Sequence, residues 1–226
     1  MNLATTAPRH AVYFAPSPQH PLWALGCRWL GRDADVSLSV GAPSDPLVST
    51  PWRYGFHATL KAPMALADDE RESNWLAAVR ALAARHEPFE MPTLRVALLS
   101  DFIALRPVEP LAASHPLRRL ADDCVIALDP WRAPPAACER ERPSRVPLDA
   151  RQRENLDRLG YAFVLEDWRF HMTLSNSLGF ALSALSIELF VRLATQVPLA
   201  QLLPLLAAGP ALGLWALRPL LKPSGA

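Results

Sequence analysis

The sequence is poor in cysteine and has no excess of charge of either sign. Its three cysteines, Cys27, Cys124 and Cys138, show no Cys-x-x-Cys spacing, so neither a disulfide framework nor a zinc knuckle is indicated. Lysine and arginine total 23 against 22 aspartate and glutamate, which gives a net charge of +1. Because this balance creates no long-range field toward nucleic acid or anionic lipid, any anion site must be local.

Signals for export and for membrane insertion are also missing. The first ten residues lack the basic stretch and apolar run of a secretory signal. Residues 193–217 carry no charge and are long enough to span a bilayer. However, Pro198, Pro204 and Pro210 would break such a helix repeatedly. We therefore expect a cytoplasmic monomer that makes no membrane contact.

Hydrophobic periodicity and turn residues predict a chain that alternates strands with helices. Short β-branched and aromatic runs predict strands over residues 10–15, 56–60, 94–99, 102–105 and 161–174. Amphipathic spacing predicts helices over residues 22–30, 69–85, 116–128, 150–159 and 181–195, with Asp68 or Asp69, Ser114 and Asp149 at their starts. Polar and Pro-rich composition predicts loops over residues 32–51 and 129–147. This order indicates an α+β protein with antiparallel pairing.

The pentad Phe-His-x-Thr-Leu occurs once in each half of the sequence, around His57 and around His171. Alternate residues of a strand project from the same face. His57 and Thr59 should therefore emerge together, as should His171 and Thr173, while the apolar residues of each pentad point to a core. The repetition predicts that two imidazoles and two hydroxyls share one cleft.

Two histidines suit phosphodiester hydrolysis, because one can take a proton from water while the other gives one to the leaving oxygen. The ordinary histidine pKa of about 6.5 allows both tasks near neutral pH, and threonine hydroxyls can stabilise the nonbridging oxygens. The pattern predicts a phosphodiesterase that needs no cofactor.

Four neighbouring residues are further candidates for substrate binding. Arg169 shares the face of His171 if the strand is regular, and its guanidinium can pair with a phosphate. Lys61 has the same even spacing from His57, although a solvated strand end is the usual account of such a residue. Tyr13 and Tyr54 can line the cleft, but tyrosines in strands more commonly belong to the core.

Three alternatives compete with this interpretation. A metal site is disfavoured, because neither motif has a second histidine or a carboxylate two or four positions after its own histidine, and Glu166 and Asp167 both precede His171. An RNA-end enzyme that opens or joins 2′,5′ linkages would use the same histidines, but the near-zero net charge does not favour RNA. A protein that binds phosphorylated metabolites without turnover is the third alternative.

The paired His-x-Thr motifs resemble the signature of the two-histidine (2H) phosphoesterases. The wording of residues 11–16, 53–63 and 160–174 is similar to a branch encoded beside bacterial phosphonate-utilisation genes. The resemblance implies two pseudo-symmetric lobes, each a small antiparallel sheet backed by helices, around a central cleft. It implies one such domain over residues 1–226, with residues 179–226 divergent from the family.

The resemblance also implies a substrate class and roles for the motif residues. The substrate would be a small, cyclic phosphodiester of a ribose or nucleotide. His57 and His171 would be the acid and the base, and Thr59 and Thr173 would bind the phosphate. The sequence does not decide which histidine is the acid.

Overall fold

The computed structural model describes residues 8–34, 43, 45–67, 70–134 and 147–178. The predicted helix over 181–195, the divergent residues 179–226 and most of the predicted loop over 129–147 lie outside the described residues. No helix in the described part of the chain is long and apolar enough to cross a membrane.

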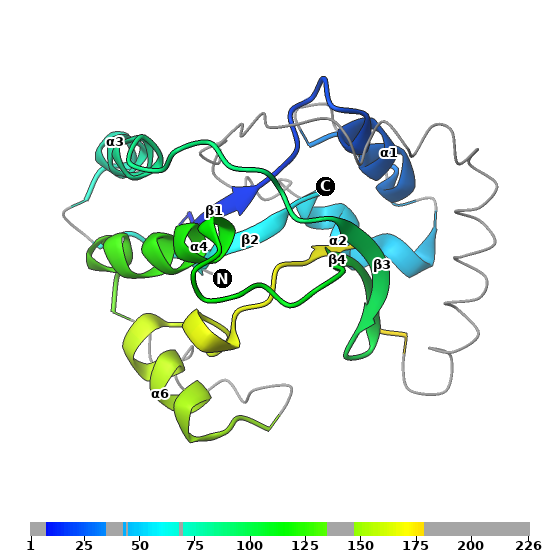
Figure 1. Ribbon diagram of the computed structural model, residues 1–226. Coiled ribbons are helices and arrows are strands. Elements are labelled where there is room, and N and C mark those ends of the chain that lie inside the picture. Colours follow the sequence, from blue (N-terminus) through cyan, green and yellow to red (C-terminus); the bar gives the residue numbers. More distant parts are fainter. Residues whose placement is uncertain (1–7, 35–42, 44, 68–69, 135–146, 179–226) are drawn as a thin grey trace, which may run out of the picture.

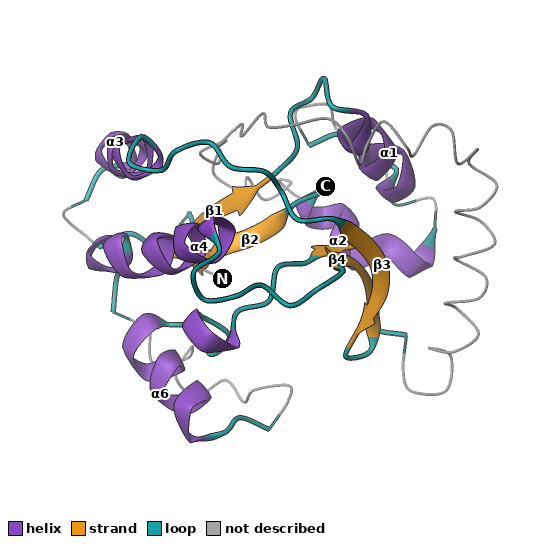
Figure 2. Ribbon diagram, viewed as in Figure 1, coloured by secondary structure: helices purple, strands orange, loops and turns teal. Residues whose placement is uncertain are grey.

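The strands form one open antiparallel sheet of five strands, in the order β1-β2-β5-β4-β3 (Figure 2). Their bounds are His10–Phe14 (β1), Ala58–Met64 (β2), Leu94–Leu99 (β3), Phe102–Pro107 (β4) and Met172–Thr173 (β5). The two strands that carry the pentads, β2 and β5, are neighbours within this sheet. The predicted mixed α and β class with antiparallel pairing is thus confirmed.

Helices lie around this sheet, and α4 packs against β2 (Figure 1). The α-helices are Pro21–Leu30 (α1), Ser49–Tyr54 (α2), Glu72–Ala83 (α3), Pro116–Ala127 (α4) and Ala150–Leu159 (α6). Within the described residues, the short 3-10 helices are Pro46–Val48 (η1), Asp129–Trp131 (η2) and Leu165–Asp167 (η3).

Helix ends follow from local chemistry, although the cap of α4 differs from the prediction. Asp149 caps α6 in a reciprocal pair with Gln152, and Gly160 ends the helix in the left-handed region with φ 73°. The predicted cap Ser114 is wrong, because α4 is capped by His115, whose Nδ1 accepts from the Leu117 amide at 3.1 Å. A proline at the next position, already fixed at a helical φ, starts the helix.

Three predicted boundaries are wrong. The loop over 32–51 contains η1 and the start of α2, and α3 begins at Glu72 after Arg71, not after an aspartate cap. Of the strand predicted over 161–174, only Met172–Thr173 is a strand, and the segment before it contains η3, at which Leu165 has a φ of 51°. Ala162 and Val164 are buried without strand pairing, and a short buried run has the same sequence pattern whether or not it is a strand.

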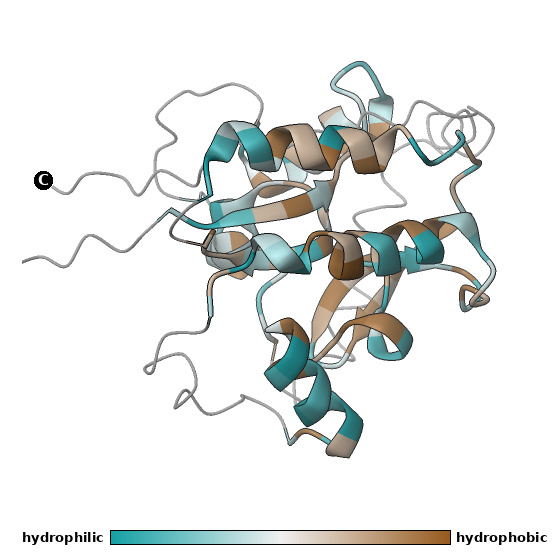
Figure 3. Cartoon of the chain, turned by 90° about the vertical axis from the view of Figure 1, so that its left-hand side faces the viewer, coloured by the Kyte–Doolittle hydropathy of each residue, from teal (hydrophilic) through white to brown (hydrophobic). Residues whose placement is uncertain are grey.

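The core lies behind the motif strands. It receives the apolar residues of both pentads, together with side chains from α1, α3 and α4. By contrast, α6 is almost entirely hydrophilic and is the lowest helix in Figure 3. The pentad residues in this core are Phe56, Ala58, Leu60, Phe170, Met172 and Leu174. The predicted alternation of polar and apolar residues along each pentad is therefore confirmed.

Candidate functional site

The two motif histidines are held by the same local contact. Nδ1 of His57 lies 2.9 Å from the carbonyl oxygen of Gly55, and Nδ1 of His171 lies 2.8 Å from that of Arg169. Because a carbonyl can only accept, each Nδ1 carries the hydrogen. In the neutral form, each Nε2 is therefore left with a free lone pair. Both pentads therefore hold their imidazole through the same contact, with Nδ1 directed to the carbonyl two residues earlier.

The sheet register brings the four polar motif residues together. Ala58 of β2 is paired with Met172 of β5. Continuing this antiparallel register places Thr59 opposite His171 and Thr173 opposite His57. All four side chains are partly exposed on the face opposite the core. The structure thus brings both histidines and both threonines to one site, but as neighbours in a single sheet.

Burial keeps His57 neutral. Its ring stacks on Tyr13, with the ring centroids 3.8 Å apart and the planes inclined by 27°. Desolvation lowers the pKa of His57 to about 4, the hydrogen bond to Gly55 opposes this, and the nearby His171 lowers it further. At neutral pH the imidazole of His57 is therefore uncharged.

His171 has a different surrounding on β4. The ring of Phe102 lies 5.7 Å from its ring, centroid to centroid. Burial lowers the pKa of His171, and the charge of Arg106 lowers it further, against the opposing hydrogen bond to Arg169. The sequence interpretation missed Arg106. Arg106 lies one residue beyond the strand predicted over 102–105, and alternation continued past that limit puts it on the same face as Ala104, which is paired with Thr173.

The two tyrosines differ in their burial. Tyr13 is 6% exposed, and burial raises its pKa to about 12, with a further rise from Tyr54. It is both a core residue and the platform under His57. Tyr54 is 44% exposed at the end of α2 and is not a core residue. The structure thus places Tyr13 against His57, whereas Tyr54 is near enough to Tyr13 to raise the pKa of Tyr13.

Lys61 and Arg169 are engaged elsewhere. Lys61 is 4% exposed, so the expected solvated strand end is wrong. Its Nζ donates to the carbonyl of Val125 near the end of α4 and lies 3.6 Å from Asp129, where a cation complements the helix terminus. The exposed Arg169 donates to the carbonyls of Glu166 and Trp168 through Nη1, at 2.8 and 3.0 Å. Since the segment is not a regular strand, alternation does not place Arg169 beside His171.

Each motif strand is tied to the other half of the chain by an indole. Nε1 of Trp168, just before the second motif, donates to the carbonyl of Thr59 at 2.9 Å. Nε1 of Trp29, on α1, donates to the carbonyl of Leu174 at 2.7 Å. The Asn176 side chain accepts from the Thr50 amide at 2.7 Å and donates to Ser49 Oγ at 2.8 Å. These reciprocal contacts fix the two motifs relative to each other.

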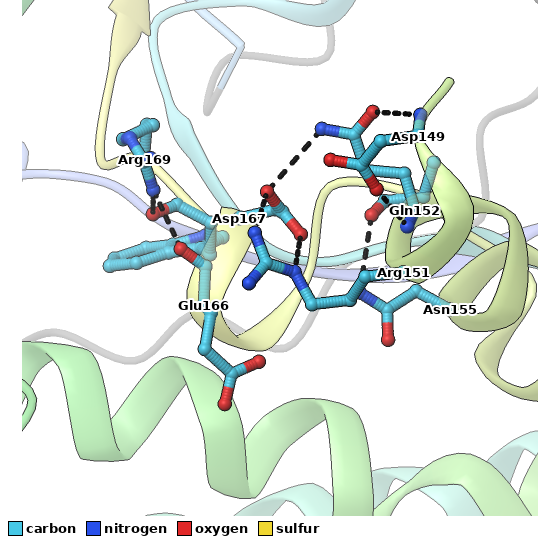
Figure 4. A network of polar contacts seen from close by, with 9 residues as sticks. Asp149, Arg151, Gln152, Asn155, Glu166, Asp167 and Arg169 are labelled. Carbon is cyan, nitrogen blue, oxygen red and sulfur yellow. Dashed lines mark hydrogen bonds and ion pairs between the residues drawn. The ribbon is translucent and has the colours of Figure 1, made fainter.

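A polar network supports the approach to His171. Both carboxylate oxygens of Asp167 accept from Arg151, at 2.9 and 3.0 Å, and Gln152 donates at 3.3 Å (Figure 4). The hydrogen bond from Arg151 holds the pKa of Asp167 below its usual range. The start of α6 is thereby connected to η3, which immediately precedes the second motif. Asp167 thus acts here as a structural residue.

No cluster of three or more histidine, cysteine, aspartate or glutamate side chains suited to a metal is found in the described part of the chain. We assign no metal or cofactor to the motif face.

The protein thus has a mixed α and β fold in which the two strands of the His-x-Thr motifs are paired in one sheet. Residues 59–203 match the family described as "Protein of unknown function (DUF1045)". This is more than half of the chain, and the protein belongs to the DUF1045 family. No solved structure matches it.

Curated relatives add a functional name. The chain is 41% identical over 176 residues to "Ribose 1,5-bisphosphate phosphokinase PhnN" of Laribacter hongkongensis, with 75% of this chain and 40% of the relative covered. It is 37% identical over 179 residues to the protein of the same name from a Janthinobacterium species, with 75% and 39% covered. The chain thus spans about two-fifths of the length of these relatives.

These findings correct the functional prediction. The family and the PhnN-named bacterial relatives link the chain to phosphonate utilisation, as the resemblance implied. However, the relatives are named kinases, which transfer a phosphoryl group, and not phosphoric diester hydrolases. The prediction of a cyclic phosphodiesterase is therefore wrong, and neither its RNA-end alternative nor its binding-only alternative is supported.

Proposed function

We propose that this chain takes part in phosphorylating a ribose phosphate, and that the motif face binds the sugar phosphate that accepts the phosphoryl group. The observation that carries the proposal is the convergence of both motifs on one face, with His171 close enough to lower the pKa of His57. The name of the relatives supplies the substrate class, ribose 1,5-bisphosphate.

The state of the imidazoles suits a phosphorylated sugar. A neutral His57, with its Nδ1 hydrogen directed to Gly55, offers Nε2 as an acceptor for a sugar hydroxyl. The hydroxyls of Thr59 and Thr173 can donate to phosphate oxygens. A bound phosphate would favour protonation of His171, which would then donate to it as well.

The site is assigned to the phosphoryl acceptor and not to a nucleotide donor. A phosphate-binding loop of the type Gly-x-x-x-x-Gly-Lys-Ser/Thr needs a lysine directly after glycine. The two lysines of this sequence, Lys61 and Lys222, both follow leucine.

We also propose that the fold is a form of the two-histidine architecture. In support, each motif strand has an outer antiparallel neighbour, β1 beside β2 and β4 beside β5. The two motifs also share one imidazole contact and one burial pattern. Two lobes related by pseudo-symmetry would produce this repetition.

The test is calorimetric titration of the protein with ribose 1,5-bisphosphate. We expect binding by the wild type and at least tenfold weaker binding by His171→Ala, because hydrogen bonds to charged groups contribute about 1.5–3 kcal/mol. His57→Ala should bind about two- to tenfold more weakly, because a hydrogen bond to a neutral hydroxyl contributes about 0.5–1.5 kcal/mol. His86→Ala is the matched control, since His86 pairs with Asp123 at 3.1 Å outside the motif strands.

Either of two results would contradict the proposal. The first is a folded wild-type protein with no affinity for ribose 1,5-bisphosphate. The second is a set of motif variants that bind this sugar as tightly as His86→Ala does. Transfer of labelled phosphate from ATP to the same sugar, with and without this chain in a reaction with its full-length relatives, tests the kinase connection separately.

A further inference from the structure

Two arginines stand directly opposite each other on the hairpin beside the second motif. Arg95 of β3 is paired with Arg106 of β4. Like charges at directly opposite positions of an antiparallel pair are destabilising. Neither guanidinium has an ion-pair partner within the described ranges. The hairpin therefore carries uncompensated positive charge at one position.

This position continues the row of the functional site. The printed pairs of β4 with β5 are Ala104 with Thr173 and Leu105 with Met172. The next step of that register places Arg106 opposite His171. The effect of Arg106 on the pKa of His171 supports this proximity. Neighbouring strands are about 4.8 Å apart, so Arg106 is one strand, and Arg95 two strands, away from His171.

The whole row joins five strands. Tyr13 of β1 is paired with Thr59 of β2, and Thr59 stands opposite His171 by the register of β2 with β5. Arg106 and Arg95 extend the row on β4 and β3. Polar groups that can bind a sugar phosphate thus run across the sheet from the first motif to the edge strand.

A structural role uses only part of the hydrogen-bonding capacity of these two arginines. Arg106 is half-buried and donates from Nη1 to the carbonyl of Leu98 at 3.0 Å. This bond orients the guanidinium but uses one of its five hydrogens. Arg95 is exposed on the edge strand. Two guanidinium groups that face the same side can share one phosphate, because each presents a planar fork that fits its oxygens.

We propose that Arg106 and Arg95 form an anion subsite that binds the second phosphate of a sugar bisphosphate whose first phosphate lies at the paired motifs. This inference rests on the proposed function and gives the site its preference for a bisphosphate over a monophosphate. The partial neutralisation of two opposed cations by one phosphate supplies the driving force.

The experiment compares three probes, ribose 1,5-bisphosphate, ribose 5-phosphate and inorganic diphosphate, by calorimetric titration. We expect Arg106→Gln and Arg95→Gln to weaken bisphosphate binding at least tenfold and to change ribose 5-phosphate binding less than twofold. Arg80→Gln, which removes an exposed charge from α3, should change neither. Because Arg95 is exposed, its substitution tests the subsite even if Arg106→Gln fails to fold.

The outcomes separate this inference from the proposed function. If the wild type binds both sugars equally, or the arginine variants lose both equally, the subsite is wrong and the acceptor role stands. If diphosphate binds in an Arg95-dependent way and neither sugar binds, the two arginines bind an anion, but the sugar-bisphosphate subsite and the acceptor role are both wrong. If none of the three probes binds the folded protein, both are overturned.

Discussion

The two halves of the site share a pentad but are built on different supports. The first motif leads into β2, a strand of seven residues paired along its length with β1. The second lies in β5, a strand of two residues that is preceded by η3 and anchored through Asp167 to α6. Both nevertheless hold the imidazole on the carbonyl two residues earlier.

The pentad thus determines how each imidazole is oriented, whereas residues from neighbouring strands determine the charge around it. His57 lies against Tyr13, which carries no charge, whereas His171 lies near the cation Arg106. Burial lowers the pKa of both histidines. The positive charge of Arg106, next to His171, is one that a bound phosphate can neutralise.

The largest expected effect concerns the first residue of each pentad. Phe56→Ala and Phe170→Ala should each lower the free energy of unfolding by about 3–5 kcal/mol, the usual cost of truncating a buried phenylalanine. Both rings are nearly inaccessible, at 2% and 3%. Urea denaturation measures the two losses, and Tyr54→Ala, at an exposed position, is the control. A small loss at one site alone would show that the halves do not contribute equally to the core.

The next effect separates the histidines by pH. Folded His57 takes up its proton near pH 4, whereas the unfolded chain does so near 6.5, so the unfolded state binds more protons between these values. The contribution of His57 to the free energy of unfolding is therefore fully present above pH 6.5. It is lost as the pH drops toward 4, and the loss is at most about 3 kcal/mol. In His57→Gln this loss should be smaller, as measured by urea denaturation at several pH values. An unchanged pH dependence would place His57 in contact with solvent.

A smaller effect tests the ties between the halves. Trp168→Phe and Trp29→Phe each remove one indole hydrogen bond to a motif strand, which should cost about 0.5–1.5 kcal/mol. The double variant should lose more than the sum, because both bonds hold the same pair of strands. Thermal unfolding of the wild type, the two single variants and the double variant gives the coupling free energy between the two hydrogen bonds. Strict additivity would show that each indole supports its strand independently.

The smallest effect is confined to one imidazole. Arg106→Leu should raise the pKa of His171, since it removes a nearby positive charge, and should leave the pKa of His57 in place. An NMR titration that follows the carbon-bound ring protons of His57 and His171 measures both pKa values in one sample. Equal movement of the two would mean that Arg106 acts through the fold as a whole.

Much of the local structure follows from the sequence. The period of two along each pentad predicted which residues are buried, and Asp149 with Gly160 predicted the limits of α6. The strand predicted over 161–174 failed because Ala162 and Val164 are buried by packing and not by pairing. The roles expected for Lys61 and Arg169 failed because even spacing predicts a face only while the strand remains regular.

The sequence by itself determined the two pentads and the side of the sheet that each residue faces, because alternation is a property of the extended backbone. The tertiary structure decided that β2 and β5 are neighbours, that Tyr13 lies under His57, and that Arg106 stands beside His171. These contacts join residues far apart in the chain, and only the strand order and register of the folded sheet bring them together.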